Sequence, residues 1–308
     1  MRWLGLGPLL CCACRIGFDP LGVGGVGDID ASGDGIVTTE FRDASPLPAF
    51  NPPIQQTALS SARDDQGPSL TADLLEIYFY SGRNCGNCYD VFVAKRATAT
   101  SAWGTPTEVT ELTNAAWDMA PEISPDGLTL WWASERSSGA GVSDIWVTTR
   151  PDRTSAWATP MRETNLSTPG YDLDPALSDD GLTMTLTSDG PSSGTIASDL
   201  YISTRATLTS PWSTPVPISE LNTSVHESAG SLRSGGHLLY MGRETTAGKF
   251  DIHVAARQSA TTPFSPPVLL DNVNGPQLDF DAWLSADEHT MFFASDRTGN
   301  MEIYEATR

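Results

Sequence analysis

Acidic side chains recur at fixed positions along this chain, and they are the groups whose type and spacing could do chemistry. One set, with steps of 53, 54, 55 and 52 residues, consists of Asp65, Asp118, Asp172, Glu227 and Asp279. Asp174 and Asp281 stand two residues after the third and fifth of these opening acids. Alternate residues of a strand share a face, so all seven carboxylates could gather at one end of neighbouring strands. Such a ring could hold a cation such as Ca2+, or place an acid and a base for glycoside hydrolysis.

A structural role competes with both kinds of chemistry. An acid that occurs in every repeat is best explained by a task performed in every repeat, such as accepting backbone N–H bonds at a turn. An active site should break the repeat. We therefore expect the opening acids to be structural, and we assign no catalytic residue and no cofactor, with Ca2+ left as the candidate ligand of the ring.

The remaining landmarks of each repeat keep fixed intervals, except that the gap between the turn and the second acid varies from 15 to 19 residues. A turn lies eight residues after the opening acid, as in "SPDG" at 124–127. A second acid then begins an apolar stretch and is followed six residues later by arginine, as in Asp144 and Arg150. Seven residues beyond the arginine comes an aromatic residue, as in Trp157. We expect the arginine to pair with a second acid, within its blade or between blades, because both lie on one strand face, and the aromatic residue to pack between repeats.

Short alternating segments such as "LTLWWAS" (128–134) and "DIWVTTR" (144–150) lie between turn-rich stretches, and no sustained helical stripe is present. The fold class is therefore predicted to be all-β. Each repeat offers four strand candidates, and repeats of about fifty residues with four antiparallel strands are typical of β-propellers. We predict a five-bladed β-propeller over residues 46–308.

The segment "AFNPPIQQ" (49–56) predicts how this ring closes. Phe50 precedes Asp65 by fifteen residues, the interval that separates Trp103 from Asp118, and the chain ends at Arg308 after the third strand of the last repeat. Residues 50–60 should therefore supply the fourth strand of the last blade. We expect deletion of residues 46–60 to destabilise the whole propeller.

The net charge excludes one class of partner. The chain has 18 Lys and Arg against 38 Asp and Glu, a formal net charge of −20. This field repels phosphate backbones and anionic headgroups, so nucleic-acid binding is not expected.

The N-terminal region indicates export. Residues 1–14, "MRWLGLGPLLCCAC", combine one arginine, an apolar run and three cysteines, which resembles a lipoprotein signal with Cys14, or alternatively Cys12, as the acylated residue. A plain secretory signal is the alternative. Residues 15–45 have the composition of a flexible acidic linker. Within them Asp30–Phe41 begins like a calcium loop but lacks the acid at its last position, so we interpret it as linker.

Two further cysteines, Cys85 and Cys88, fall in the variable loop of the first repeat. In an oxidising environment they most simply form a disulfide, with redox activity or half a metal site as the alternatives. The four histidines are scattered, and none forms a spaced metal pair.

The repeats resemble a known family. "SPDGLTLWWASERSSGAGVSDIWVTTR" and "LSADEHTMFFASDRTGNMEIYEATR" are similar to the WD-repeat-like Pro-Asp repeats of TolB-type propellers, and the resemblance covers residues 65–308. The first and fourth repeats, "LTADLLEIYFYSGR" and "LRSGGHLLYMGR", depart from that pattern. The resemblance implies an exported propeller that binds envelope components and has no catalytic residues of its own.

We therefore expect a monomeric, non-catalytic binding or scaffold protein of the bacterial cell envelope. It would contact a membrane only through a lipid anchor, as an outer-membrane lipoprotein facing the periplasm or the surface, and its partner would be an envelope protein or a polysaccharide. The alternative is a glycan-active five-bladed propeller, either a lectin or a glycoside hydrolase, that uses the channel carboxylates.

Overall fold

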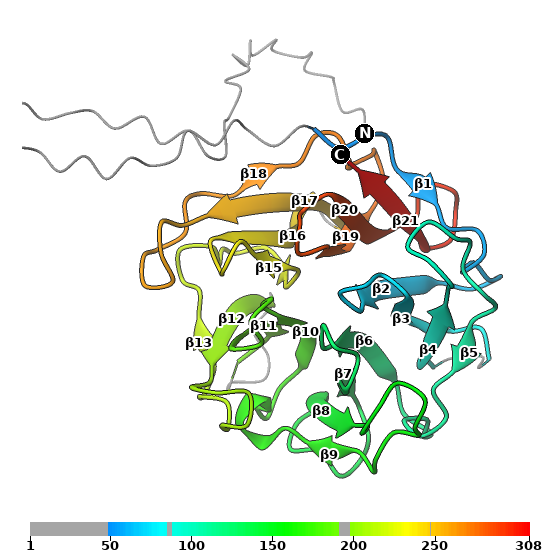
Figure 1. Ribbon diagram of the computed structural model, residues 1–308. Coiled ribbons are helices and arrows are strands. Elements are labelled where there is room, and N and C mark those ends of the chain that lie inside the picture. The colour runs from blue at the N-terminus through cyan, green and yellow to red at the C-terminus, as the bar shows by residue number, and fades with distance from the viewer. Residues whose placement is uncertain (1–48, 85–87, 191–197, 247) are drawn as a thin grey trace, which may run out of the picture. The chain divides into compact units, whose positions relative to one another are not determined.

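The computed structural model describes residues 49–84, 88–190, 198–246 and 248–308. These residues belong to one compact unit, 49–308, built as five antiparallel blades of four strands around a central axis (Figure 1). The described residues include a single turn of 3-10 helix, Thr164–Leu166, and none of their helices is long and apolar enough to cross a membrane. The prediction of an all-β, five-bladed propeller is confirmed.

Each blade runs from an inner strand at the axis to a short outer strand. Blade 1 contains β2 (Asp65–Leu70), β3 (Glu76–Ser81), β4 (Asp90–Lys95) and β5 (Thr107–Glu108). Blade 2 contains β6 (Asp118–Ile123), β7 (Thr129–Ser134), β8 (Asp144–Thr149) and β9 (Met161–Arg162). Blade 3 contains β10 (Asp172–Leu177), β11 (Thr183–Ser188), β12 (Asp199–Thr204) and β13 (Val216–Pro217).

Blade 4 has a divided inner strand, and blade 5 combines both ends of the described chain. Blade 4 contains β14 (Glu227–Ser228) and β15 (Leu232–Arg233) as its inner strand, then β16 (Leu238–Thr246), β17 (Lys249–Ala256) and β18 (Val268–Leu269). Blade 5 contains β19 (Asp279–Leu284), β20 (Thr290–Ser295), β21 (Glu302–Thr307) and, as its outer strand, β1 (Ile54–Gln55).

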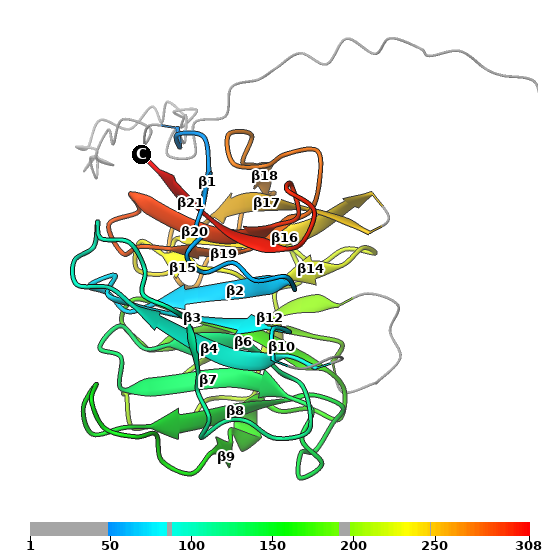
Figure 2. The same cartoon turned by 90° about the vertical axis from the view of Figure 1, so that its right-hand side faces the viewer.

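The predicted closure of the ring is therefore confirmed. β1 pairs antiparallel with β21, with Ile54 opposite Glu305 (Figure 2). The Asn51 N–H donates to the Thr307 carbonyl at 2.7 Å, and the Gln56 N–H donates to the Ile303 carbonyl at 2.8 Å. These bonds satisfy the outer edge of β21, which would otherwise present unpaired backbone groups.

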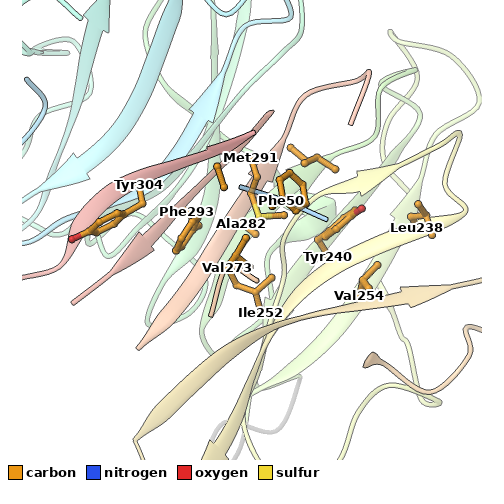
Figure 3. Close-up of a cluster of buried hydrophobic side chains, with 12 residues drawn as sticks. Phe50, Leu238, Tyr240, Ile252, Val254, Val273, Ala282, Met291, Phe293 and Tyr304 are labelled. Atoms are coloured by element: carbon orange, nitrogen blue, oxygen red, sulfur yellow. The ribbon is translucent and has the colours of Figure 1, made fainter. Parts of the chain in front are cut away.

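The core consists of five apolar clusters, one between each pair of neighbouring blades. Figure 3 shows the cluster between blades 4 and 5, where Phe50 lies with Tyr240, Ile252 and Phe293. Each of the other clusters contains the aromatic residue expected to pack between repeats: Trp103, Trp157, Trp212 and Phe264. The first residues of the propeller thus help to hold its last two blades together.

The recurring arginine has a different partner from the one predicted. Its guanidinium lies 4.0–4.4 Å from the centroid of the repeat's aromatic ring, in the pairs Arg96–Trp103, Arg150–Trp157, Arg205–Trp212, Arg257–Phe264 and Arg308–Phe50. Among the described residues, none of these arginines forms an ion pair with a second acid, either of its own blade or of a neighbouring one; Arg150 pairs with Glu76 and Arg308 with Glu288. Six residues along a strand span about 20 Å, so the shared face does not bring the two charges together.

Candidate functional site

The five opening acids are buried and engaged by their own repeats. The Arg136 guanidinium donates to Asp118 at 2.9 Å and the Arg83 guanidinium to Asp65 at 2.5 Å. Asp279 and Glu227 have the corresponding partners Arg297 and Arg243, whereas Asp172 accepts from Thr168 and Ser188. These contacts give a structural reason for an acid in every repeat.

A different group of acids lines the cavity on the propeller axis. The cavity encloses about 360 Å3, counting the solvent at its mouth, and its wall includes Asp174, Asp281 and Glu122. None of the five opening acids is among the residues that line it. The structure therefore brings together Asp174 and Asp281 from the predicted ring and adds Glu122.

Backbone irregularities aim Asp174 and Asp281 at the axis. The strand register shifts between Leu173 and Ala176 and between Phe280 and Trp283. At these bulges Asp174 has φ +46° and Asp281 has φ +54°, in the left-handed region that residues other than glycine rarely adopt. A bulge bends its strand and redirects the side chain, which here places two carboxylates from blades 3 and 5 in one cavity.

Burial and mutual repulsion change the proton affinity of this pair. Burial raises the pKa of Asp174 to about 6. A hydrogen bond of 2.8 Å, donated by Thr187 Oγ1 to Asp174 Oδ2, acts in the opposite direction and lowers this pKa. Burial, together with the charge of Asp174, raises the pKa of Asp281 well above its ordinary value. Asp281 Oδ2 has no hydrogen-bond partner among the described residues. Near neutral pH the pair therefore favours a protonated Asp281 beside an ionised Asp174.

Glu122 stands four residues after the opening acid of its repeat, whereas Asp174 and Asp281 stand two residues after theirs. Its Oε2 accepts from Ser69 Oγ at 2.7 Å and its Oε1 from the Leu177 N–H at 2.9 Å. Burial raises the pKa of Glu122 to about 7, opposed by the charge of Arg233. The buried Arg233 donates to the carbonyls of Leu284 and Leu177, at 2.6 and 3.2 Å. This network joins the inner strands of all five blades.

Sequence reasoning missed Glu122, although a signal for it was present. The corresponding residue of the other inner strands, four after the opening acid, is Ser69, Ala176, Ser231 or Trp283. An acid at this place in one repeat alone breaks the pattern, as an active site is expected to do. The same comparison distinguishes Asp174 and Asp281, because the other blades have Gly67, Ala120 and Ala229 there.

Several predicted sites cannot be placed in this structure. Cys12, Cys14, the export segment 1–14, the linker 15–45 and Cys85 lie outside the described residues. Cys88 is disulfide-bonded. Across the part of the chain that the structure describes, no group of three or more His, Cys, Asp or Glu side chains is arranged to hold a metal ion. The Ca2+ assignment stays a prediction.

Comparisons with known proteins support the fold more than a family. No family model matches the chain, and no curated protein matches it in sequence. Among solved structures, TolB from Acinetobacter baumannii is similar with a TM-score of 0.50 and 14% identity over 82% of this chain. The match spans 56% of the TolB chain, so this protein corresponds to about half of it.

Glycoside hydrolases have similar folds over nearly their full length. The α-L-arabinofuranosidase of Podospora anserina, solved with cellotriose, matches with a TM-score of 0.55 and 14% identity, over 84% of this chain and 95% of its own. The endo-arabinase of Bacteroides thetaiotaomicron matches with a TM-score of 0.54 and 16% identity, over 85% and 98%. At these identities the likeness shows a shared propeller fold.

These matches correct the expectation of a protein without enzymatic activity. That expectation followed from the resemblance to TolB-type propellers and from the recurrence of the opening acids in every repeat. It was wrong as an inference from architecture, because the same architecture is found in an arabinofuranosidase and an arabinase. The predicted resemblance to TolB-type propellers is confirmed for the propeller fold. The function therefore has to be argued from the residues of the cavity.

Proposed function

We propose that this protein is a glycan-active enzyme, a glycoside hydrolase whose acid and base are Asp281 and Asp174. The observation that carries the proposal is the break in the repeat at the channel. Three blades have Gly67, Ala120 and Ala229 where the other two have carboxylates. A structural role shared by the repeats does not account for two acids that only two blades possess.

The protonation state of the pair suits the reaction. Glycoside hydrolysis needs one protonated carboxyl group that donates to the leaving oxygen and one carboxylate that attacks the sugar or activates a water molecule. The raised pKa of Asp281 keeps its proton near neutral pH, while Asp174, with a pKa of about 6, is ionised. The hydrogen bond from Thr187 orients Asp174. Asp281 Oδ2 is buried and has no hydrogen-bond partner among the described residues, so a substrate that reached it would meet an unpaired oxygen.

The rest of the cavity supports binding of a small, hydroxyl-rich group. Its wall alternates small residues, such as Ala120 and Gly230, with the three carboxylates. Glu122, which lines the cavity, is held by hydrogen bonds from Ser69 and from the Leu177 N–H. A sugar entering beside Asp174 and Asp281 would therefore meet fixed polar groups. The substrate would be a polysaccharide outside the cytoplasm, in keeping with the export expected from residues 1–14.

A hydrolysis screen tests the proposal. The structural neighbours include an arabinofuranosidase and an endo-arabinase, so the first substrates to test contain arabinose. They are arabinan, arabinoxylan and arabino-oligosaccharides, with cellotriose as a further probe. We expect release of reducing sugar from one of these. Asp281→Asn and Asp174→Asn should each lower the rate by about 100- to 10,000-fold, the usual contribution of a general acid or base.

The control is Asp271→Asn, an exposed carboxylate on the segment between blades 4 and 5. It should retain full activity, and the melting temperatures of all variants show whether they are folded. Activity that survives in folded Asp174→Asn and Asp281→Asn would overturn the proposal, as would the absence of hydrolysis across the panel.

A further inference from the structure

Three aromatic side chains link the channel carboxylates to the surface. Tyr80 and Tyr89 meet edge to face with ring centroids 5.3 Å apart, and Tyr89 and Trp117 do so at 5.5 Å. We call these three residues the aromatic track. Exposure increases along it, from 9% for Tyr80 to 40% for Trp117.

The inner end of the track belongs to the channel. The Tyr80 hydroxyl donates to Gln66 Oε1 at 3.2 Å. Burial and the charges of Asp281 and Asp174 raise the pKa of Tyr80 well above its ordinary value, so this hydroxyl stays protonated beside the proposed acid and base. The buried Tyr80 ring lies against Gly67, which lines the cavity, so the track begins directly behind the cavity wall.

The outer end of the track is held in place by the backbone. Trp117 immediately precedes the opening acid of blade 2, and the Glu135 N–H donates to its carbonyl at 3.0 Å. The Asp118 N–H donates to the carbonyl of Tyr89 at 2.8 Å. These bonds hold the backbone at Trp117 and Tyr89, and the edge-to-face contact of the two rings sets their relative position before a ligand arrives.

The composition of the track favours a carbohydrate. The face of an aromatic ring is electron-rich and attracts the polarised C–H groups of a sugar ring, while hydroxyl groups need polar partners at its rim. Such partners are present, because Tyr89 Oη lies 3.4 Å from Asp64 Oδ2 and Gln66 contacts Tyr80. We infer that the outer part of the aromatic track, the half-buried Tyr89 and the exposed Trp117, binds the sugar residues of an oligosaccharide that extends from the channel across blades 1 and 2. The inference rests on the proposed function and names the substrate as a chain longer than one sugar.

The repeat does not require an aromatic residue at the outer end. The residues that immediately precede the other opening acids are Asp64, Tyr171, His226 and Leu278. Packing shared by all blades therefore does not explain Trp117. A protein partner on this surface is the competing occupant, and the experiment below separates it from a glycan.

Calorimetry with arabinose and arabinotriose tests the inference. Asp174→Asn serves as the background, so that the probes are bound without being cleaved. We expect arabinotriose to bind more tightly than arabinose. Adding Trp117→Ala should weaken arabinotriose binding about five- to tenfold, the loss expected for one aromatic contact, and leave arabinose unchanged. Trp117→Phe should recover part of the difference.

Leu208→Ala provides the control, because Leu208 is 61% exposed and lies beside Gly181 in the turn after β10. Equal affinities with and without Trp117 overturn the aromatic track alone, provided that the wild-type protein cleaves the probe. Neither binding nor hydrolysis of any probe in the panel overturns the proposed function and the track together, and leaves this surface to a protein partner.

Discussion

At the scale of residues, the channel carboxylates depend on a backbone conformation that the repeat already contains. Ala120 has φ +47° and Gly67 has φ +62° at the places that correspond to Asp174 and Asp281. The left-handed conformation is therefore a property of the bulge in the inner strand, and the two acids use it. Its cost, about 1–2 kcal/mol for a residue other than glycine, is offset by the surrounding sheet.

Gly67 permits the close approach of Tyr80 to the channel. A Cβ atom on Gly67 would lie 2.5 Å from Tyr80 Cε1, whereas one on Gly235, with the same φ of +62°, would meet nothing within 4 Å. We predict that Gly67→Ala destabilises the protein by at least 1–2 kcal/mol more than Gly235→Ala, because overpacking adds to the shared backbone strain. Urea unfolding of the two variants measures the difference. Equal losses would contradict the contact between Gly67 and Tyr80.

At the scale of elements, the outer strand of blade 5 is as much a part of the ring as the strands around it. The ring centroid of Phe50 lies 4.3 Å from Cζ of Arg308. Phe50 is buried between blades 4 and 5, and Leu59 is buried between blades 5 and 1. One short segment thus contributes to two of the five clusters. Its loss would also expose the edge of β21.

Removal of this segment should therefore destabilise the whole propeller. We predict that Phe50→Ala costs about 3–5 kcal/mol, as expected for a buried phenylalanine, and that Phe264→Ala costs a similar amount because Phe264 has the same place under Arg257. Deletion of residues 49–60 should lower the melting temperature further than either. A truncated protein that melts like the full chain would contradict ring closure by β1.

For the strands and turns, the spacing of residues in the sequence predicted their positions better than it predicted which side chains would contact each other. The constant intervals placed the strands and the aromatic residues correctly, since each interval is fixed by a strand or turn that every blade repeats. They could not identify the partner of the recurring arginine, because the ring of Trp157 comes beside Arg150 only when the chain turns back after β8. Contacts across blades, such as Ser69 with Glu122, were likewise outside the reach of spacing within one repeat.

At the scale of the whole molecule, the repeat predicted the fold, and departures from the repeat identify the candidate site. The sequence alone indicated five blades and their closure, but it assigned the same weight to all seven acids of the ring. The distinction came from the structure, where opening acids such as Asp118 are paired with arginine and Asp174 and Asp281 line the cavity. Function could not follow from the fold, since propellers of this kind serve binding and catalysis alike.

The central claim is that Asp174 and Asp281 work as one acid–base pair, and the pH dependence of hydrolysis tests it most directly. Asp174 must be ionised, so the rate should rise as the pH increases through its pKa of about 6. Asp281 must be protonated, so the rate should fall at higher pH, where the raised pKa of that carboxyl is passed. We therefore predict a bell-shaped profile of kcat/KM. A rate that stays constant from pH 5 to pH 8, or that is greatest near pH 4 where both carboxyls are protonated, would contradict the account.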